Sequence, residues 1–79
     1  MEREVVLNGK YIHFKGHKYE VIALAKDSND LSSVVVYKNV DTNEIWTRNK
    51  DDFLSEVDHI KYPNVKQKYR FELIEEESN

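Results

Sequence analysis

Seventy-nine residues are enough for one small domain and leave no room for a separate catalytic domain. The 12 lysines and arginines stand against 15 aspartates and glutamates, and the formal net charge of −3 excludes a whole-domain field that would attract nucleic acid or anionic lipid. The absence of cysteine excludes disulfides, thiolate catalysis and cysteine-based zinc sites, and it is typical of proteins kept in a reducing cytoplasm.

Most of the sequence has the pattern of β-strands. Residues 10–14 and 18–26 are rich in aromatic and β-branched residues, and Lys15-Gly16 between them predicts a hairpin turn because glycine adopts positive φ without strain. The polar cluster at 27–30 predicts the next turn. Alternation along the second strand places four side chains on one face: Tyr19, Val21, Ala23 and Ala25.

A second hairpin and a closing strand follow. Residues 33–40 hold the strongest β signal in the chain, and residues 45–48 return after the polar turn 41–44. Residues 69–74 alternate between apolar and polar side chains and form the last predicted strand, while residues 57–62 are a further candidate strand. The domain is therefore predicted to be mainly β.

One short helical turn is predicted after the second hairpin. Asn49 has the side chain of a good N-cap, and Asp51 and Asp52 fall in the first turn, where carboxylates interact favourably with the helix dipole. A helix this short depends on packing for its stability. The expected core residues of the whole domain are Val21, Val36, Phe53 and Phe71.

The order of these elements predicts an all-β domain with one short helical turn. Small sheets can remove their exposed edges by closing on themselves, which favours a small SH3-like barrel of five strands. An open antiparallel sheet with one short helix is the alternative. We expect residues 1–8 to be an N-terminal extension, residues 9–74 to be the single barrel domain, and residues 75–79 to be an acidic, disordered tail.

Four segments of the sequence carry a family resemblance. They are Gly9-Lys10-Tyr11-Ile12-His13-Phe14-Lys15-Gly16, Val35-Val36-Tyr37, Trp46 with Arg48, and Arg70-Phe71. On these segments residues 9–71 resemble the uncharacterised bacterial family catalogued as domain of unknown function sixteen-fifty-three. The chain departs from the usual family residues at Asp27, Asn49 and Asp52, where the family usually has His, Pro and Met. The resemblance supports the domain boundary and implies no activity.

Five residues on three predicted strands form the candidate ligand-binding surface: Tyr11, His13, Tyr37, Trp46 and Arg48. Aromatic faces beside a guanidinium suit a peptide or a flat ring in a shallow groove. The competing interpretation is that Trp46 and the tyrosines fill the core. If they form a surface, we expect Arg48→Ala to leave folding nearly unchanged and to weaken binding.

A second candidate surface lies in the stretch that precedes the last strand. It contains no acid, and its basic residues alternate with tyrosines: Lys61, Lys66, Lys68 and Arg70. Basic residues interleaved with aromatic ones are compatible with a nucleic-acid interface. A solubilising, lysine-rich loop is the more ordinary interpretation.

Catalysis and metal binding have little support in the sequence. A zinc site needs three or four ligands, and His13 with His17 across a turn offers two at best; Asp27 or Asp58 could complete the set, but no spacing requires it. The chain also lacks a phosphate-binding glycine loop and any Ser-His-Asp pattern in a recognisable context. We therefore predict no metal, no cofactor and no enzymatic activity.

The favoured function is a non-catalytic binding module for a protein segment or a small ligand, and the alternative is a nucleic-acid-associated barrel that uses residues 61–70. No signal sequence is recognisable and no apolar run is long enough to span a membrane, which predicts a cytoplasmic protein without membrane contact. We expect a monomer or a weak homodimer. In a third hypothesis a second copy of the chain covers Ile22 and Leu24.

Overall fold

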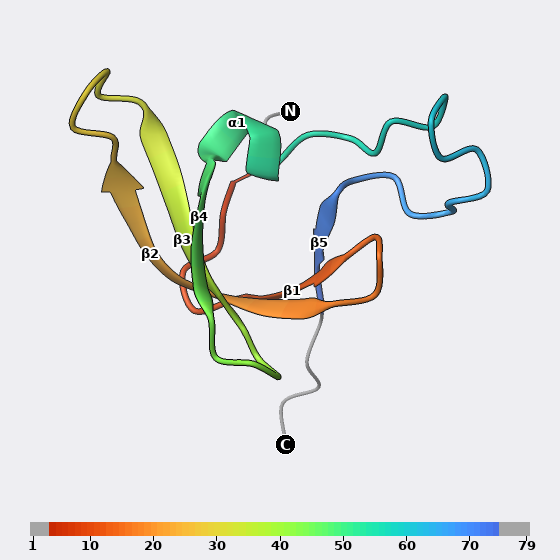
Figure 1. The fold of residues 1–79 in the computed structure, drawn as a ribbon, viewed down its shortest axis with the longest axis horizontal. Coiled ribbons are helices and arrows are strands. Elements are labelled where there is room, and N and C mark those ends of the chain that lie inside the picture. The colour runs from red at the N-terminus through yellow and green to blue at the C-terminus, as the bar shows by residue number, and fades with distance from the viewer. Residues whose placement is uncertain (1–3, 75–79) are drawn as a thin grey trace.

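A computed structural model describes residues 4–74, which form a five-stranded antiparallel sheet and one turn of helix (Figure 1). The order across the sheet is β4-β3-β2-β1-β5. All five predicted strands are confirmed, with ends within two residues of the predicted ones. The elements are β1 (Lys10–His13), β2 (Lys18–Lys26), β3 (Ser33–Asn39), β4 (Ile45–Asn49), α1 (Lys50–Phe53) and β5 (Phe71–Leu73).

The sheet is open, so the prediction of a closed SH3-like barrel is wrong and the alternative of an open sheet describes the fold. Strands β4 and β5 are the two edges and do not pair with each other. Strand β5 has three residues and pairs with β1. The rings of Phe53 and Phe71 stack with their centroids 4.3 Å apart. The inner face of the bent sheet is thus filled by side chains instead of being closed by backbone hydrogen bonds.

Strand β2 is the centre of the sheet and contains a β-bulge. The register shifts between Val21 and Ala23, so that Leu24 and not Ala23 pairs with the buried Val35 of β3. Directly paired residues point to the same face, and a bulge inserts one extra residue into the alternation. The prediction that Ala23 and Ala25 continue the face of Val21 is therefore wrong.

The core lies on the inner face of the sheet, beneath α1. Val21, Phe53 and Phe71 are buried there as predicted. The predicted core residue Val36 is only half-buried, because the alternation of β3 turns Val35 inward instead. The complete set of buried apolar residues within residues 4–74 is Tyr11, Val21, Val35, Tyr37, Phe53, Val57 and Phe71.

Asn49 caps α1 as the sequence predicts. Its side-chain oxygen accepts hydrogen bonds from the backbone N–H groups of Asp51 and Asp52, with N···O distances of 2.9 and 3.4 Å. The cap fixes the first turn of a helix too short to be stable alone. It thereby places Phe53 in the core and Asp52 beside the end of β4.

Removal of this cap gives a first testable result. Asn49→Ala is expected to destabilise the domain by about 1 kcal/mol, the usual cost of losing an N-cap side chain. Urea denaturation of the two proteins measures the difference. The exposed Asn64 provides the matched control, since Asn64→Ala removes the same side chain from a loop. Equal unfolding midpoints for all three proteins would contradict a capping role.

A long loop connects α1 to β5, and the candidate strand at residues 57–62 is wrong. The Asp58 carboxylate accepts hydrogen bonds from the backbone N–H groups of Ile60 and Lys61, at 3.1 and 3.2 Å, which favours a turn over a strand. The Gln67 side chain fastens the loop to the sheet by donating to the Ile12 carbonyl oxygen at 3.0 Å. The loop is therefore held beside the end of β1.

The segment before β1 also contacts the domain. Val5 packs against the core, and the backbone N–H of Val6 donates to the Tyr11 hydroxyl at 2.9 Å. The predicted acidic tail, 75–79, and the first three residues of the predicted N-terminal extension lie outside the described residues. Within residues 4–74 no helix has the length and apolar character needed to cross a membrane.

Candidate functional site

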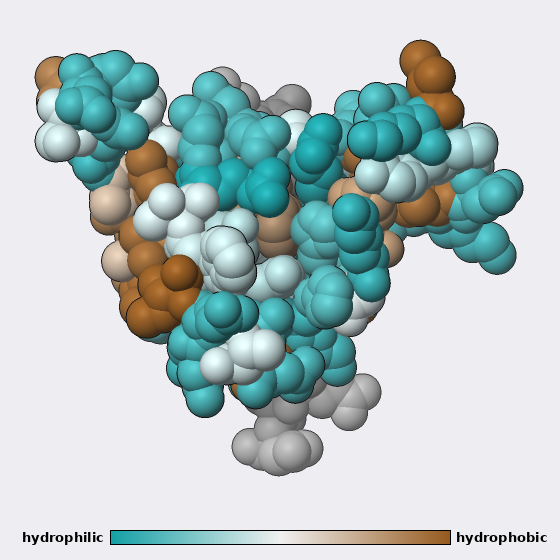
Figure 2. All heavy atoms as spheres, in the orientation of Figure 1, coloured by the Kyte–Doolittle hydropathy of each residue, from teal (hydrophilic) through white to brown (hydrophobic). Residues whose placement is uncertain are grey.

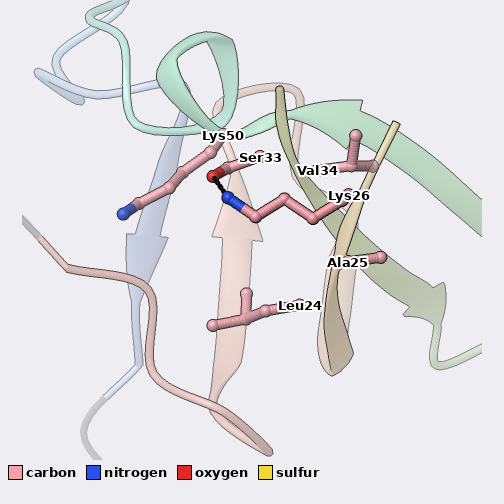
Figure 3. A pocket seen from close by; sticks show the side chains of 6 residues that line it. All are labelled: Leu24, Ala25, Lys26, Ser33, Val34 and Lys50. Atoms are coloured by element: carbon pink, nitrogen blue, oxygen red, sulfur yellow. Dashed lines mark hydrogen bonds between the residues drawn. The ribbon is translucent and has the colours of Figure 1, made fainter. Parts of the chain in front are cut away.

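Two pockets on the described part of the chain have the size of a small-ligand site. The first lies where β2 and β3 meet the start of α1 and has a volume of about 330 Å³. The Lys26 ammonium donates to the Ser33 hydroxyl across it at 3.4 Å (Figure 3). None of the candidate site residues from the sequence lines it. Its lining residues are Leu24, Ala25, Lys26, Ser33, Val34 and Lys50.

The second pocket, which we call the cationic pocket, lies between the β1–β2 turn, the end of β4 and the loop before β5. Its volume is about 310 Å³. Four cationic side chains and one carboxylate line it, in a chain whose net charge is −3. Positive charge is therefore concentrated here against the overall sign of the protein. The lining residues are His13, Phe14, Lys15, Arg48, Asp58, Lys61, Tyr62 and Arg70.

Arg48 forms the most rigidly held wall of the cationic pocket. Its Nε donates to the Tyr37 hydroxyl at 3.3 Å, and its Nη1 donates to the Asp52 carboxylate at 2.6 Å. The guanidinium also lies over the Phe71 ring, 5.4 Å from the centroid. Burial lowers the pKa of Arg48, but the hydrogen bonds to Tyr37 and Asp52 outweigh it and keep the pKa above its ordinary value.

The other three cations keep most of their donors free. Lys15, Lys61 and Arg70 form no ion pair with a carboxylate inside the range 4–74. The buried Nε of Arg70 has no hydrogen-bond acceptor among the described residues. Buried donors of this kind are normally satisfied, and because this Nε is itself buried it offers no hydrogen bond to a ligand in the pocket.

His13 supplies a neutral donor to the same pocket. Its ring lies 4.4 Å from the ring of Phe14 and 4.8 Å from that of Phe71. Burial, and next the charges of Arg48 and Lys15, lower the pKa of His13 to about 4. The backbone N–H of Lys15 donates to Nδ1 at 3.2 Å, so the neutral imidazole carries its proton on Nε2.

The lowered pKa of His13 predicts acid-sensitive stability. In the unfolded chain His13 binds a proton below its ordinary pKa of 6.5, whereas in the folded domain it does so only below about 4. The unfolded state therefore gains protons first as the pH falls, and stability decreases between these two values. His13→Phe retains an aromatic ring and removes the titration. Between pH 7 and pH 4 the melting temperature should fall less for this variant than for the parent protein. Equal decreases in the two proteins would contradict the assignment.

The structure separates the five residues of the first candidate surface. His13 and Arg48 line the cationic pocket. Tyr11 and Tyr37 are core residues, only 1% and 5% exposed, so their rings present no face to a ligand. Trp46 is 48% exposed on the edge strand β4 but lines neither pocket. A small domain gains more from burying tyrosine rings than from displaying them.

The second candidate surface is also divided. Lys61 and Arg70 line the cationic pocket, whereas Lys66 and Lys68 are exposed outside it. The Lys68 ammonium lies 5.3 Å from the centroid of the neighbouring Tyr69 ring. Phe14 and Asp58 also line the pocket but belonged to neither candidate surface; Phe14 was present in the family-like opening segment, and Asp58 lies in a loop without a periodic pattern.

Metal-binding residues are not grouped in the described range. Within residues 4–74 no three His, Asp or Glu side chains are placed to hold a metal ion. The Nε2 atom of His59 lies 3.0 Å from the Gln67 carbonyl oxygen, a contact that helps to order the loop.

Exposed apolar side chains occur on strands β2 and β4, and hydrophobic surface is visible on the left side of the molecule in Figure 2. Ile22, Leu24 and Ile45 are 39%, 53% and 63% exposed. The hypothesis that a second copy covers Ile22 and Leu24 stays a prediction.

The fold and the cationic pocket define a small all-β domain with an open sheet and one strongly basic, ligand-sized depression. The family described as protein of unknown function (DUF1653) matches residues 9–73, and the chain belongs to it. Comparison with curated proteins and with solved structures gave no match. Five residues from the segments that carry the family resemblance meet in the cationic pocket: His13, Phe14, Lys15, Arg48 and Arg70.

Proposed function

We propose that this domain is a non-catalytic binding module that holds a small anionic ligand, through a phosphate or carboxylate group, in the cationic pocket. The observation that carries the proposal is the gathering of four cations around about 310 Å³ in a chain of net charge −3. Like charges brought together cost free energy, so a local excess of this kind favours an anionic partner.

The chemistry of the donors supports an oxyanion as the partner. Guanidinium groups such as those of Arg48 and Arg70 match the planar geometry of carboxylates and phosphates and form charge-assisted hydrogen bonds with them. The neutral His13 adds an Nε2–H donor without adding charge. The pocket volume is at the lower end of the range for small-molecule sites. A single small anion is therefore a better fit than a large cofactor.

The same groups are poorly suited to catalysis. A histidine with a pKa of about 4 is a weak general base at neutral pH, far from the optimum near the working pH. The Asp58 carboxylate is engaged by two backbone N–H groups of its own turn. Binding without chemistry is the function these residues support.

An NMR titration with inorganic phosphate tests the proposal. Lys61→Glu and Lys66→Glu make the same change in net charge, but only Lys61 lines the cationic pocket. Loss of one charge-assisted contact and introduction of a repulsive carboxylate should weaken phosphate binding about tenfold or more in Lys61→Glu. Lys66→Glu should change the affinity much less. Equal losses in the two variants would indicate non-specific attraction and would contradict the proposed site.

A further inference from the structure

The cationic pocket contains features that a bare anion does not need. The rings of Phe14 and Tyr62 meet at its wall with centroids 5.1 Å apart and an angle of 58° between their planes. Both rings are only half-buried, so each keeps accessible surface. The Lys15 ammonium lies 5.9 and 5.8 Å from the two centroids. Cationic and aromatic groups thus share one end of the pocket.

A carboxylate is the second such feature. Asp58 lines the pocket beside the cations, although a carboxylate repels any anion placed near it. Its Oδ1 atom accepts both hydrogen bonds from the backbone of the turn, and no donor is placed on Oδ2 within residues 4–74. An oxygen of this kind is an acceptor for a hydroxyl group of a ligand. The pocket therefore offers groups for an anion, a flat ring and a hydroxyl together.

We infer that the ligand is a nucleoside phosphate, either free or as one unit of a single strand; this inference rests on the proposed function. The phosphate would lie at the guanidinium groups of Arg48 and Arg70, the base on the exposed face of Phe14 or Tyr62, and a ribose hydroxyl near Asp58. Nucleobases stack on aromatic side chains regardless of sequence, and charged groups hold the phosphate. Carboxylates commonly accept hydrogen bonds from ribose hydroxyls.

The two sources of this chemistry differ in what they contact outside the pocket. A free nucleotide ends at the cationic pocket. A single strand continues beyond it and brings further phosphates to the surface of the loop, where Lys66 and Lys68 are exposed. Contacts to those phosphates are electrostatic and sensitive to salt.

The test compares inorganic phosphate, adenosine monophosphate and adenosine by NMR titration of the unmodified domain. Stacking of one base is expected to make adenosine monophosphate bind about tenfold tighter than phosphate. Tyr62→Leu should remove most of this gain, so that adenosine monophosphate and phosphate bind this variant with similar affinity. Trp46→Leu is the matched control, because it removes a ring that lies outside the pocket, and should change neither affinity.

The outcomes separate the inference from the proposed function. If phosphate shifts the signals of the pocket but adenosine monophosphate binds no tighter, the inference is overturned and anion binding stands. If none of the three ligands shifts those signals, both fail. These results come from the unmodified protein, so they hold even if Tyr62→Leu does not fold. The double variant Lys66→Glu, Lys68→Glu distinguishes the two sources. If it binds a single-stranded hexanucleotide more weakly than the parent protein does, while its affinity for adenosine monophosphate is unaffected, the ligand is a strand. If the hexanucleotide binds both proteins with equal affinity, the ligand is the free nucleotide.

Discussion

Phe71→Ala is expected to unfold most of the domain. The Phe71 ring is 1% exposed, stacks on Phe53 and lies 5.5 Å from the ring of Tyr37. It therefore joins β5 to the helix and to β3 in one cluster. Replacing a buried Phe by Ala costs about 3–5 kcal/mol. Small domains have a total stability of roughly 5–15 kcal/mol, and one of this length is expected near the bottom of that range.

Circular dichroism during a thermal melt measures this effect. Ile60→Ala is the control, since Ile60 is 95% exposed and its loss removes no buried contact. We expect the control to melt with the parent protein and Phe71→Ala to show little or no cooperative transition. A melting curve of Phe71→Ala that overlays the parent would show that the ring cluster does not hold the sheet together.

Arg48→Ala is expected to reduce both stability and anion binding. The side chain bonds the Tyr37 hydroxyl, pairs with Asp52 and covers the Phe71 ring, so it is part of the structure as well as of the pocket. The sequence alone led us to expect nearly unchanged folding for this variant. With a partly buried hydrogen-bond network removed, the expected cost is about 1–3 kcal/mol. Phosphate affinity should fall at least as far as in Lys61→Glu.

Arg48→Lys separates the two roles. Lysine restores the charge but not the planar fork that reaches two acceptors at once. We expect it to recover part of the phosphate affinity and little of the stability, measured by NMR titration and by urea denaturation respectively. If Arg48→Ala binds phosphate as the parent does, Arg48 has only a structural role and does not contribute to phosphate binding in the cationic pocket.

The strands and the helix cap were predictable because local patterns specify them. Alternation, turn residues and the Asn49 side chain act over a few positions. They predicted the ends of these elements to within two residues. The bulge in β2 was not predictable, because the apolar run around Ile22 has no residue that marks an insertion. One extra residue in β2 was enough to end the alternation that Val21 begins, so that Leu24 and not Ala23 pairs with Val35.

The open edge and the pocket depend on contacts between distant segments. The barrel does not close because β4 and β5 do not pair with each other, and aromatic rings fill the inner face of the sheet instead. The large rings of Tyr11 and Tyr37 were attractive as site residues but were buried for stability. Phe14 and Tyr62 are 48 positions apart in sequence, and only folding of the loop beside β1 brings them together.

Arginine side-chain NMR signals during a phosphate titration test the cationic pocket most directly. The Nε–H signals of Arg48 and Arg70 report on the two guanidinium groups, and the Lys15 amide reports on the turn beside them. Binding in the cationic pocket predicts that all three shift and reach saturation at the same phosphate concentration. Unchanged signals from Arg48 and Arg70, with shifts confined to Lys66 and Lys68 or to the pocket of Lys26 and Lys50, would contradict it.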